Sequence, residues 1–188
     1  MGGGEIQYFR DGVDAKLSAT AERALSGDGC AGAALSVVCT DNRGDFTQTT
    51  IHSEAQFPTF GTQTFAFKAH ALVGGDNVPP QRFGYLGGAG TLATVDLLAL
   101  GGDRLLYVEG EYKIPLRVFT LPFLGGPFVA LRYAAGNAGV GTLPSLIQNV
   151  GIGVGVGPIR VDYAIDPASE RSPFSRRSAV TFGVSLSF

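Results

Sequence analysis

The sequence contains no tryptophan and few charged side chains, since only 16% of its 188 residues are Asp, Glu, Lys or Arg. It also lacks any run of about 18 consecutive apolar residues, the length that a transmembrane helix requires. Its mean hydropathy is nevertheless positive, at +0.20. A positive hydropathy without a spanning helix leaves two classes of protein, one with a large hydrophobic core and one with a transmembrane β-barrel.

Three further absences exclude classes of function. A net charge of -2 and an isoelectric point near 5.6 leave no excess of basic side chains, so nucleic acid is not expected as a partner. The sequence holds no GxSxG, HExxH or CxxC motif, which removes support for three common enzyme classes. The amino terminus lacks the charged and apolar regions of a signal peptide, and Met1 to Gly4 indicates an expression remnant or a mature start.

Only two cysteines occur, Cys30 and Cys39, in a segment flanked by glycine and aspartate. This spacing predicts a disulfide that closes a loop in an oxidising compartment, and two unpaired thiols are the alternative. No histidine or further cysteine lies nearby at ligand spacing, so neither a metal nor another cofactor is expected.

Apolar and polar side chains alternate in eight segments, which lie at residues 13–22, 46–57, 64–73, 106–114, 128–133, 149–156, 159–165 and 180–188. Such segments, joined by alternately short and long connections, are typical of transmembrane barrels. The sequence therefore predicts one all-β domain, residues 1–188, folded as an eight-stranded antiparallel transmembrane β-barrel. A soluble lipocalin-like barrel has the same strand number but inverts the two faces.

An even number of strands places both termini on one side of the membrane, which we expect to be the periplasmic side. The tight turns near Pro58, Gly157 and the link 115–126 are then periplasmic. The connections around Cys30, Gly90, Asn137 and Glu170 are then extracellular.

Nearly all charges of the predicted strands fall on one face. We expect that face to line the lumen, because the glycine row of residues 149–156 makes room for long side chains inside a narrow barrel. The apolar face also continues to Phe188. Paired charges satisfy one another in a dry interior, so the lumen is predicted to be plugged by its own side chains. The predicted lumenal ion network comprises Glu54, Lys68, His70, Glu109, Glu111, Lys113, Arg132, Arg160 and Asp162.

A set of motifs runs from residue 81 to the end of the chain. The first part comprises Gln81, Arg82, Phe83, Leu86, Gly87, Gly88, Thr91, Leu92, Gly102, Asp103 and Arg104. EYKIPL at 111–116, GPIRVDYA at 157–164 and the terminal VTFGVSLSF follow. In this order and spacing the chain resembles the BamA/TamA-type outer-membrane assembly factor superfamily, also called the bacterial surface antigen family.

The resemblance implies a protein of the Gram-negative bacterial outer membrane. Members typically have sixteen strands, with this loop before the last five, so the chain resembles the carboxy-terminal half of such a barrel without POTRA modules. The family inserts or translocates membrane proteins. It also implies two partners, the lipid bilayer and the assembly machinery, the latter contacted through a carboxy-terminal sorting signal at Phe182, Leu186 and Phe188.

One departure from the family pattern bears on activity. The family carries Arg-Gly-aromatic in the loop, and its arginine contacts acidic residues of the barrel wall, whereas this chain has Ala93-Thr94-Val95. An eight-stranded barrel also encloses little more than its own side chains, so the loop is not expected to fold deep into the lumen, as it would in a sixteen-stranded relative. We therefore expect a truncated family member without insertase activity of its own.

Three alternatives stay open. The chain is the carboxy-terminal part of a larger insertase or translocase, or it is a small outer-membrane lipid hydrolase that uses His52. The hydrolase is disfavoured, because Ser53 points away from His52 in a strand, and the protein is expected not to be an enzyme. Self-association as a homodimer is the third, through a small-residue surface formed by Ala15, Ala19 and Ala21.

Overall fold

The computed structural model describes residues 2–24, 45–75, 77–116, 126–168 and 175–184, together with the backbone of 30–33 and 36–39. Within these ranges the chain is all-β, apart from one short 3-10 helix, η1 (Pro80–Arg82). None of the described helical structure has the length and apolar character needed to cross a membrane.

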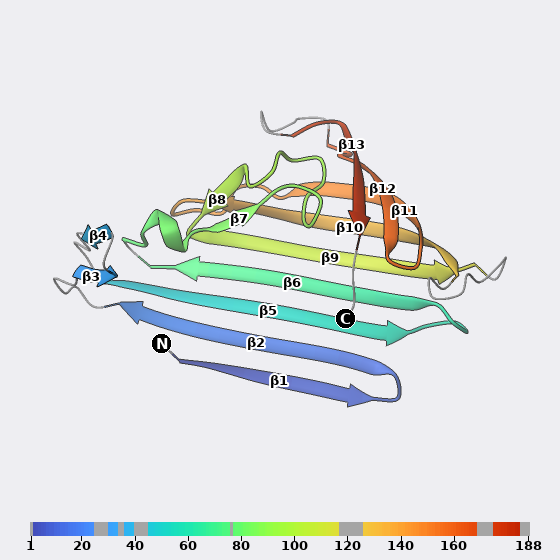
Figure 1. Ribbon diagram of the computed structural model, residues 1–188, viewed down its shortest axis with the longest axis horizontal. Helices are drawn as coiled ribbons and strands as arrows, with labels where there is room; N and C mark the ends of the chain where they lie inside the picture. The colour runs from blue at the N-terminus through green and yellow to red at the C-terminus, as the bar shows by residue number, and fades with distance from the viewer. Residues whose placement is uncertain are drawn as a thin grey trace.

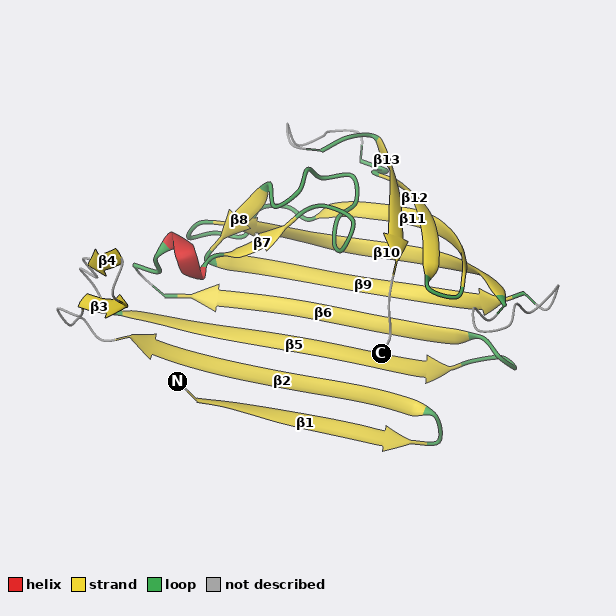
Figure 2. Ribbon diagram, viewed as in Figure 1, coloured by secondary structure: helices red, strands yellow, loops and turns green. Residues whose placement is uncertain are grey.

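One antiparallel sheet of nine strands contains most of the described chain (Figures 1 and 2). Its strands follow the order of the sequence, and each pairs with the next. They are β1 (Gly2–Arg10), β2 (Val13–Ala24), β5 (Phe46–Pro58), β6 (Thr64–Gly74), β9 (Arg104–Pro115), β10 (Pro127–Gly139), β11 (Ile147–Val156), β12 (Ile159–Ile165) and β13 (Ser178–Val184). The sheet curls towards β13 and so has a concave face (Figure 1).

Two small hairpins occupy long connections at one end of the sheet. They are β3 (Cys30–Ala33) with β4 (Ser36–Cys39), and β7 (Gly84–Leu86) with β8 (Leu100–Gly102). Short turns lie at the opposite end, for example between β1 and β2. There Asp11 and Gly12 both have positive φ, at 52° and 78°, which is the geometry of the two-residue hairpin turn that suits the twist of antiparallel strands.

All eight segments with alternating side chains form strands as far as they are described, the last one up to Val184, but the described sheet has nine strands instead of eight. A ninth strand, β1, pairs along its whole length with β2, so that Gly2–Gly4 lie opposite Ala19–Ala21. With nine antiparallel strands, the start of β1 and the end of β13 lie at opposite ends of the sheet, so the described strands do not support the expectation of both termini on one side. Asn137 lies inside β10, not in a connection.

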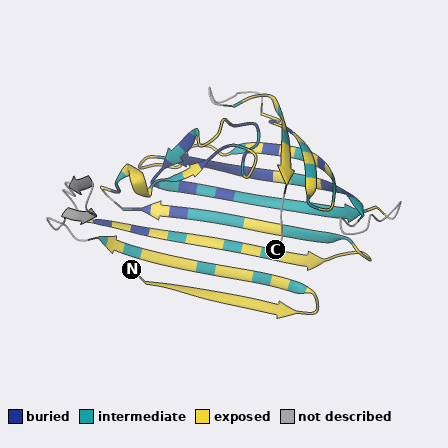
Figure 3. Cartoon of the chain, in the orientation of Figure 1, coloured by how far each residue is buried: buried dark blue, intermediate teal, exposed yellow. Residues whose placement is uncertain are grey.

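The predicted closed barrel is not found among the described residues. β1 pairs only with β2, and β13 pairs only with β12, so the sheet is open and both outermost strands have a free edge. Every residue of β1 is exposed, as Figure 3 shows.

The two faces of the sheet differ in chemistry, and the register fixes which residues share a face. Glu54 lies opposite Lys68, and Lys68 lies opposite Glu109, so these charges occupy one face. The other face is apolar, and many of its large side chains are exposed, including Ile51, Phe67, Leu131, Ile152, Tyr163 and Phe182.

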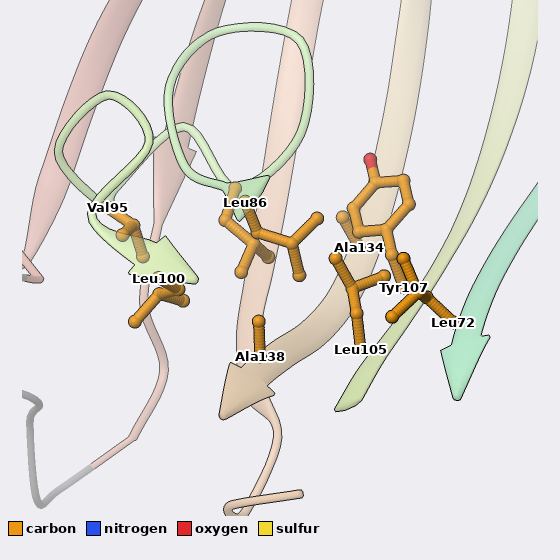
Figure 4. Packing of buried hydrophobic residues seen from close by; sticks show 9 residues of the cluster. Leu72, Leu86, Val95, Leu100, Leu105, Tyr107, Ala134 and Ala138 are labelled. Atoms are coloured by element: carbon orange, nitrogen blue, oxygen red, sulfur yellow. The ribbon is translucent and has the colours of Figure 1, made fainter. Parts of the chain in front are cut away.

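The hydrophobic core lies between the loop of residues 75–103 and the concave face (Figure 4). From the loop come Leu86, Leu92, Val95 and Leu100, and from the sheet come Leu72, Leu105, Tyr107, Ala134 and Ala138. The sheet residues of this cluster lie on the charged face. The loop is therefore folded into the concave side, against the expectation that it would not fold deep into the interior.

We expect the loop to depend on this core for its position. Replacing Leu92, which is completely buried, with Ala removes a packed side chain and should cost about 2–5 kcal/mol in the free energy of unfolding. Urea titration of the refolded protein in detergent micelles measures this change.

Leu97 provides the matched control, because it lies in the same loop and is 77% exposed. Leu97→Ala should change the free energy of unfolding by no more than about 0.5 kcal/mol. Equal effects of the two substitutions would contradict the packing of the loop on the sheet.

Candidate functional site

The loop residues that carry the family resemblance all lie in the segment that covers the concave face. Gln81 and Arg82 form part of η1, and Arg82 is paired with Glu22 of β2 at 2.9 Å. Leu86 and Leu92 are buried in the core, while Phe83 and Thr91 are half-buried. Gly102, Asp103 and Arg104 lie where β8 passes into β9.

Two glycines let the loop turn sharply on itself. Gly87 and Gly88 have φ of 120° and 94°, values that side chains rarely adopt. A Cβ on Gly87 would stand 2.1 Å from the carbonyl oxygen of Asp96, so the two arms of the loop approach too closely for any side chain. The amide of Gly87 donates to the hydroxyl of Thr91 at 2.9 Å, which closes the turn.

Arg132 of β10 connects the wall of the sheet to the loop. Its guanidinium is paired with Glu109 of β9 at 2.6 Å and donates to the carbonyl oxygens of Thr91, at 3.0 Å, and Ala89, at 3.3 Å. The hydroxyl of Tyr107 accepts from Arg132 at 3.1 Å and donates to Glu109. Arg132 and Glu109 are 15% and 12% exposed, so this is a largely desolvated pair. The Nη1 and Nη2 atoms of Arg132 also donate to the loop backbone, while its buried Nε has no hydrogen-bond partner among the described residues.

The tripeptide Ala93-Thr94-Val95 makes a second attachment to the wall. The amide of Thr94 donates to Asn149 Oδ1 of β11 at 3.0 Å, and Asn149 Nδ2 donates to the Thr94 hydroxyl at 2.8 Å. Thr94 and Asn149 are both buried, and Val95 belongs to the hydrophobic core. These three residues therefore hold the loop by neutral hydrogen bonds and packing.

A third attachment comes from the segment before β13. Val95 forms a β-bridge with Ser175, and the amide of Arg176 donates to the carbonyl of Thr94 at 2.7 Å. The side chain of Arg176 is paired with Asp96 at 2.8 Å, and both are exposed. The loop is thus held between the wall and a second connection.

The glycine row of β11 makes room for charged side chains of the neighbouring strand. A Cβ on Gly153 would stand 2.2 Å from Asp162 Oδ1 and 3.0 Å from Arg160 Nε. Arg160 chelates Asp162 at 2.7 and 2.8 Å and reaches over β10 and β11 to Glu111 of β9, at 2.6 Å. The glycines of β11 thus leave space for the side chain of Arg160, which connects β12 to β9.

Four residues of the predicted lumenal network lie outside these pairs. Glu54 and Lys68 lie opposite each other in register, and Lys113 Nζ sits 4.0 Å from the ring centre of Phe128. His70 stacks on His52, with ring centres 4.1 Å apart. Ser53 is on the opposite face of β5, so the described residues bring no serine hydroxyl to His52 from its own segment.

The charged face is only partly covered. A hollow of about 400 Å³ lies beside Ala89 and Gly90, and its floor is made by Lys68, Glu109, Glu111, Arg132, Arg160 and Asp162. A second hollow of about 170 Å³ lies over β1, β2, β5 and β6. Among the described residues, no three His, Cys, Asp or Glu side chains are grouped to hold a metal ion.

Two predicted features fall partly outside the described residues. Backbone register places Cys30 directly opposite Cys39 in the β3–β4 hairpin, but their side chains lie outside the described part, and the disulfide stays a prediction. Phe182 faces outward on β13 and is exposed, while Leu186 and Phe188 of the predicted sorting signal lie outside the described residues.

Comparison with known proteins provides no family assignment. No protein-family model matches the chain, and no curated protein matches it.

We expect the Arg132 attachment to dominate the stability of the loop. Arg132→Met leaves Glu109 buried without its partner and should cost about 3–5 kcal/mol, whereas adding Glu109→Gln should recover part of that loss. Asp96→Asn breaks only the exposed pair with Arg176 and should cost less than about 1 kcal/mol.

Two measurements check this expectation. Urea unfolding gives the free energies, and amide hydrogen exchange shows whether residues 87–97 lose protection selectively in Arg132→Met. A larger effect of Asp96→Asn than of Arg132→Met would show that the exposed pair, not the wall arginine, holds the loop.

Proposed function

We propose that the chain is an outer-membrane β-sheet protein related to the carboxy-terminal half of BamA/TamA-type barrels, with no insertase or enzyme activity of its own. In this proposal the convex face contacts lipid, and the charged face lines an interior that the loop partly fills. The observation that carries the proposal is the apolar convex face, which extends over all nine strands.

The size of that face distinguishes it from the surface of a water-soluble protein. Outward side chains of strands from β1 to β13 are large, apolar and exposed, for example Ile6, Leu17, Ile51, Phe67, Leu131, Ile152, Tyr163 and Phe182. Soluble monomers rarely expose a contiguous apolar surface of more than a few hundred Å². In contact with lipid chains such an apolar face is stable without being buried against other protein.

The opposite face fits the same arrangement. A soluble barrel with a greasy lumen would place its charges outside, but here Arg132, Glu109 and Arg160 lie on the concave side with the loop. The position of Tyr112 also supports a membrane location. Its hydroxyl is hydrogen-bonded to Gln63 and Thr59 at the end of the sheet where the short turns lie. Aromatic side chains with a polar tip are enriched at membrane interfaces.

The proposed absence of insertase activity rests on the loop. In the family pattern a loop arginine contacts the wall, whereas here the attachment runs from the wall arginine to loop carbonyls and from Thr94 to Asn149. Relation to the family is proposed from the motif residues, the first set of which lies in this loop and at the start of β9. The hydrolase alternative gains no support from Ser53, which lies on the opposite face of β5 from His52. The His52 ring itself stacks on His70.

The absence of tryptophan allows a direct test of which face meets lipid. Single tryptophans are introduced at Leu131, which points outward from β10, and at Gln56, which points inward from β5. In vesicles that contain brominated lipids, Leu131→Trp fluorescence should be strongly quenched, and Gln56→Trp fluorescence should be little affected.

Two outcomes contradict the proposal. Equal quenching at both positions would mean that the faces do not separate lipid from an interior. No quenching at either position, in protein that is folded by circular dichroism, would mean that the apolar face is covered by something other than lipid.

A further inference from the structure

The two edge strands of the described sheet lack hydrogen-bonding partners on their outer sides. β1 and β13 each pair on one side only, so each has a row of backbone N–H and C=O groups without a partner in the described chain. In a bilayer no water satisfies these groups, and each unpaired one costs several kcal/mol. The edges therefore need a partner strand if the proposed membrane function holds.

Closure of the sheet on itself is opposed by the loop. A barrel of eight strands encloses only its own side chains, and one of nine strands is little wider. Here the concave side already holds the loop of residues 75–103, with Leu86, Leu92 and Val95 packed against β9 and β10. Bringing β1 round to β13 would remove the space that the loop occupies.

We propose that a second copy of this chain completes the barrel, with β1 of each copy pairing with β13 of the other. Two sheets of nine strands give eighteen, a size that in known barrels encloses a wide interior. Such an interior accommodates two loops and leaves the charged hollow over β1, β2, β5 and β6 facing it. This inference rests on the proposed membrane function and names its partner.

The direction of the strands selects this pairing over its alternatives. Neighbouring strands of the sheet are antiparallel, so strands at odd-numbered positions in the sheet all run in the same direction. β1 is the first strand and β13 is the ninth, and the two therefore run in the same direction. Two copies in the same membrane orientation, related by a two-fold axis along the barrel, then meet in two parallel seams. Pairing of β1 with β1 would need one copy upside down, with its long loops on the wrong side.

The faces of the two edge strands match across such a seam. On β1, Ile6 and Tyr8 face outward while Glu5 and Gln7 face inward, as the register with β2 requires. On β13, Val180 and Phe182 face outward while Thr181 lies beside Asp162 on the charged face. Joining these edges continues one apolar and one polar face around the whole barrel.

The test uses cysteine cross-linking in a background with Cys30→Ser and Cys39→Ser. One form of the chain carries Tyr8→Cys, and a second form with a longer tag carries Phe182→Cys. The two are produced together in membranes and oxidised. We expect a mixed disulfide-linked product at about twice the 19.5 kDa chain mass, at least ten-fold above that from either form alone.

A short scan allows for the register of the seam, with Ile6 and Tyr8 tested against Val180, Phe182 and Val184. The matched control is Leu131→Cys, an outward position on the central strand β10, which should not link to Tyr8→Cys. A chain with both edge cysteines that forms only an intramolecular link would overturn the inference, as would self-linking of Tyr8→Cys alone.

Failure of this inference is distinguishable from failure of the proposed function. Protein that resists urea extraction and shows lipid quenching at Leu131→Trp, but gives no mixed product across the scan, overturns the second-copy inference alone. Protein that urea removes from the membrane, without quenching, overturns the membrane function itself.

Discussion

Backbone hydrogen bonding is the constraint on which the rest of this structure depends. In the nine-stranded sheet every strand between β2 and β12 has a neighbour on both sides, so its amides and carbonyls are paired without help from solvent. This makes the apolar convex face suited to lipid, where side chains meet oil and no backbone group is left unpaired. Under the same constraint, β1 and β13 of the proposed membrane protein each need a further partner strand, because each pairs on one side only.

Because the loop occupies the concave side of the sheet, a barrel that satisfies the edge strands must be wide enough to contain the loop. Its core with Leu72, Leu105 and Tyr107 occupies the concave face, and the Arg132–Glu109 pair and Thr94–Asn149 fix it from both sides. A narrow barrel would have to expel the loop and expose both its apolar residues and the desolvated pair on the wall. An open sheet retains both, at the cost of two unpaired edges.

Sequence alternation predicted most of the sheet, and the errors that followed share one source. The eight segments are strands, and the charges lie on one face, because a period of two residues is a direct record of burial on a sheet. β1 escaped detection because Gly2–Gly4 carry no side chain that could show a period. Counting eight strands instead of nine then led to the expectations of a narrow barrel, of termini on one side and of a loop that does not fold deep into the interior.

The contacts of the loop were less accessible to sequence reasoning. Charged residues such as Arg132 and Glu109 are conspicuous, and their common face follows from alternation. Thr94 and Asn149 are neutral and lie 55 residues apart, so no pattern of charge or hydropathy connects them. Tyr107 was assigned by its place in a strand, and only the folded loop shows that its hydroxyl lies between Arg132 and Glu109.

The attachment of the loop depends on which segment supplies the arginine. A loop arginine that reaches the wall ties the attachment to one side chain of the loop, and its loss would release that loop. Here the arginine belongs to the wall, and it binds carbonyl oxygens of Ala89 and Thr91, groups that every loop sequence possesses. The tripeptide Ala93-Thr94-Val95 carries no charge, and the loop is nevertheless attached to the wall. A loop held this way serves as a fixed part of the interior, which supports a structural role over an active one.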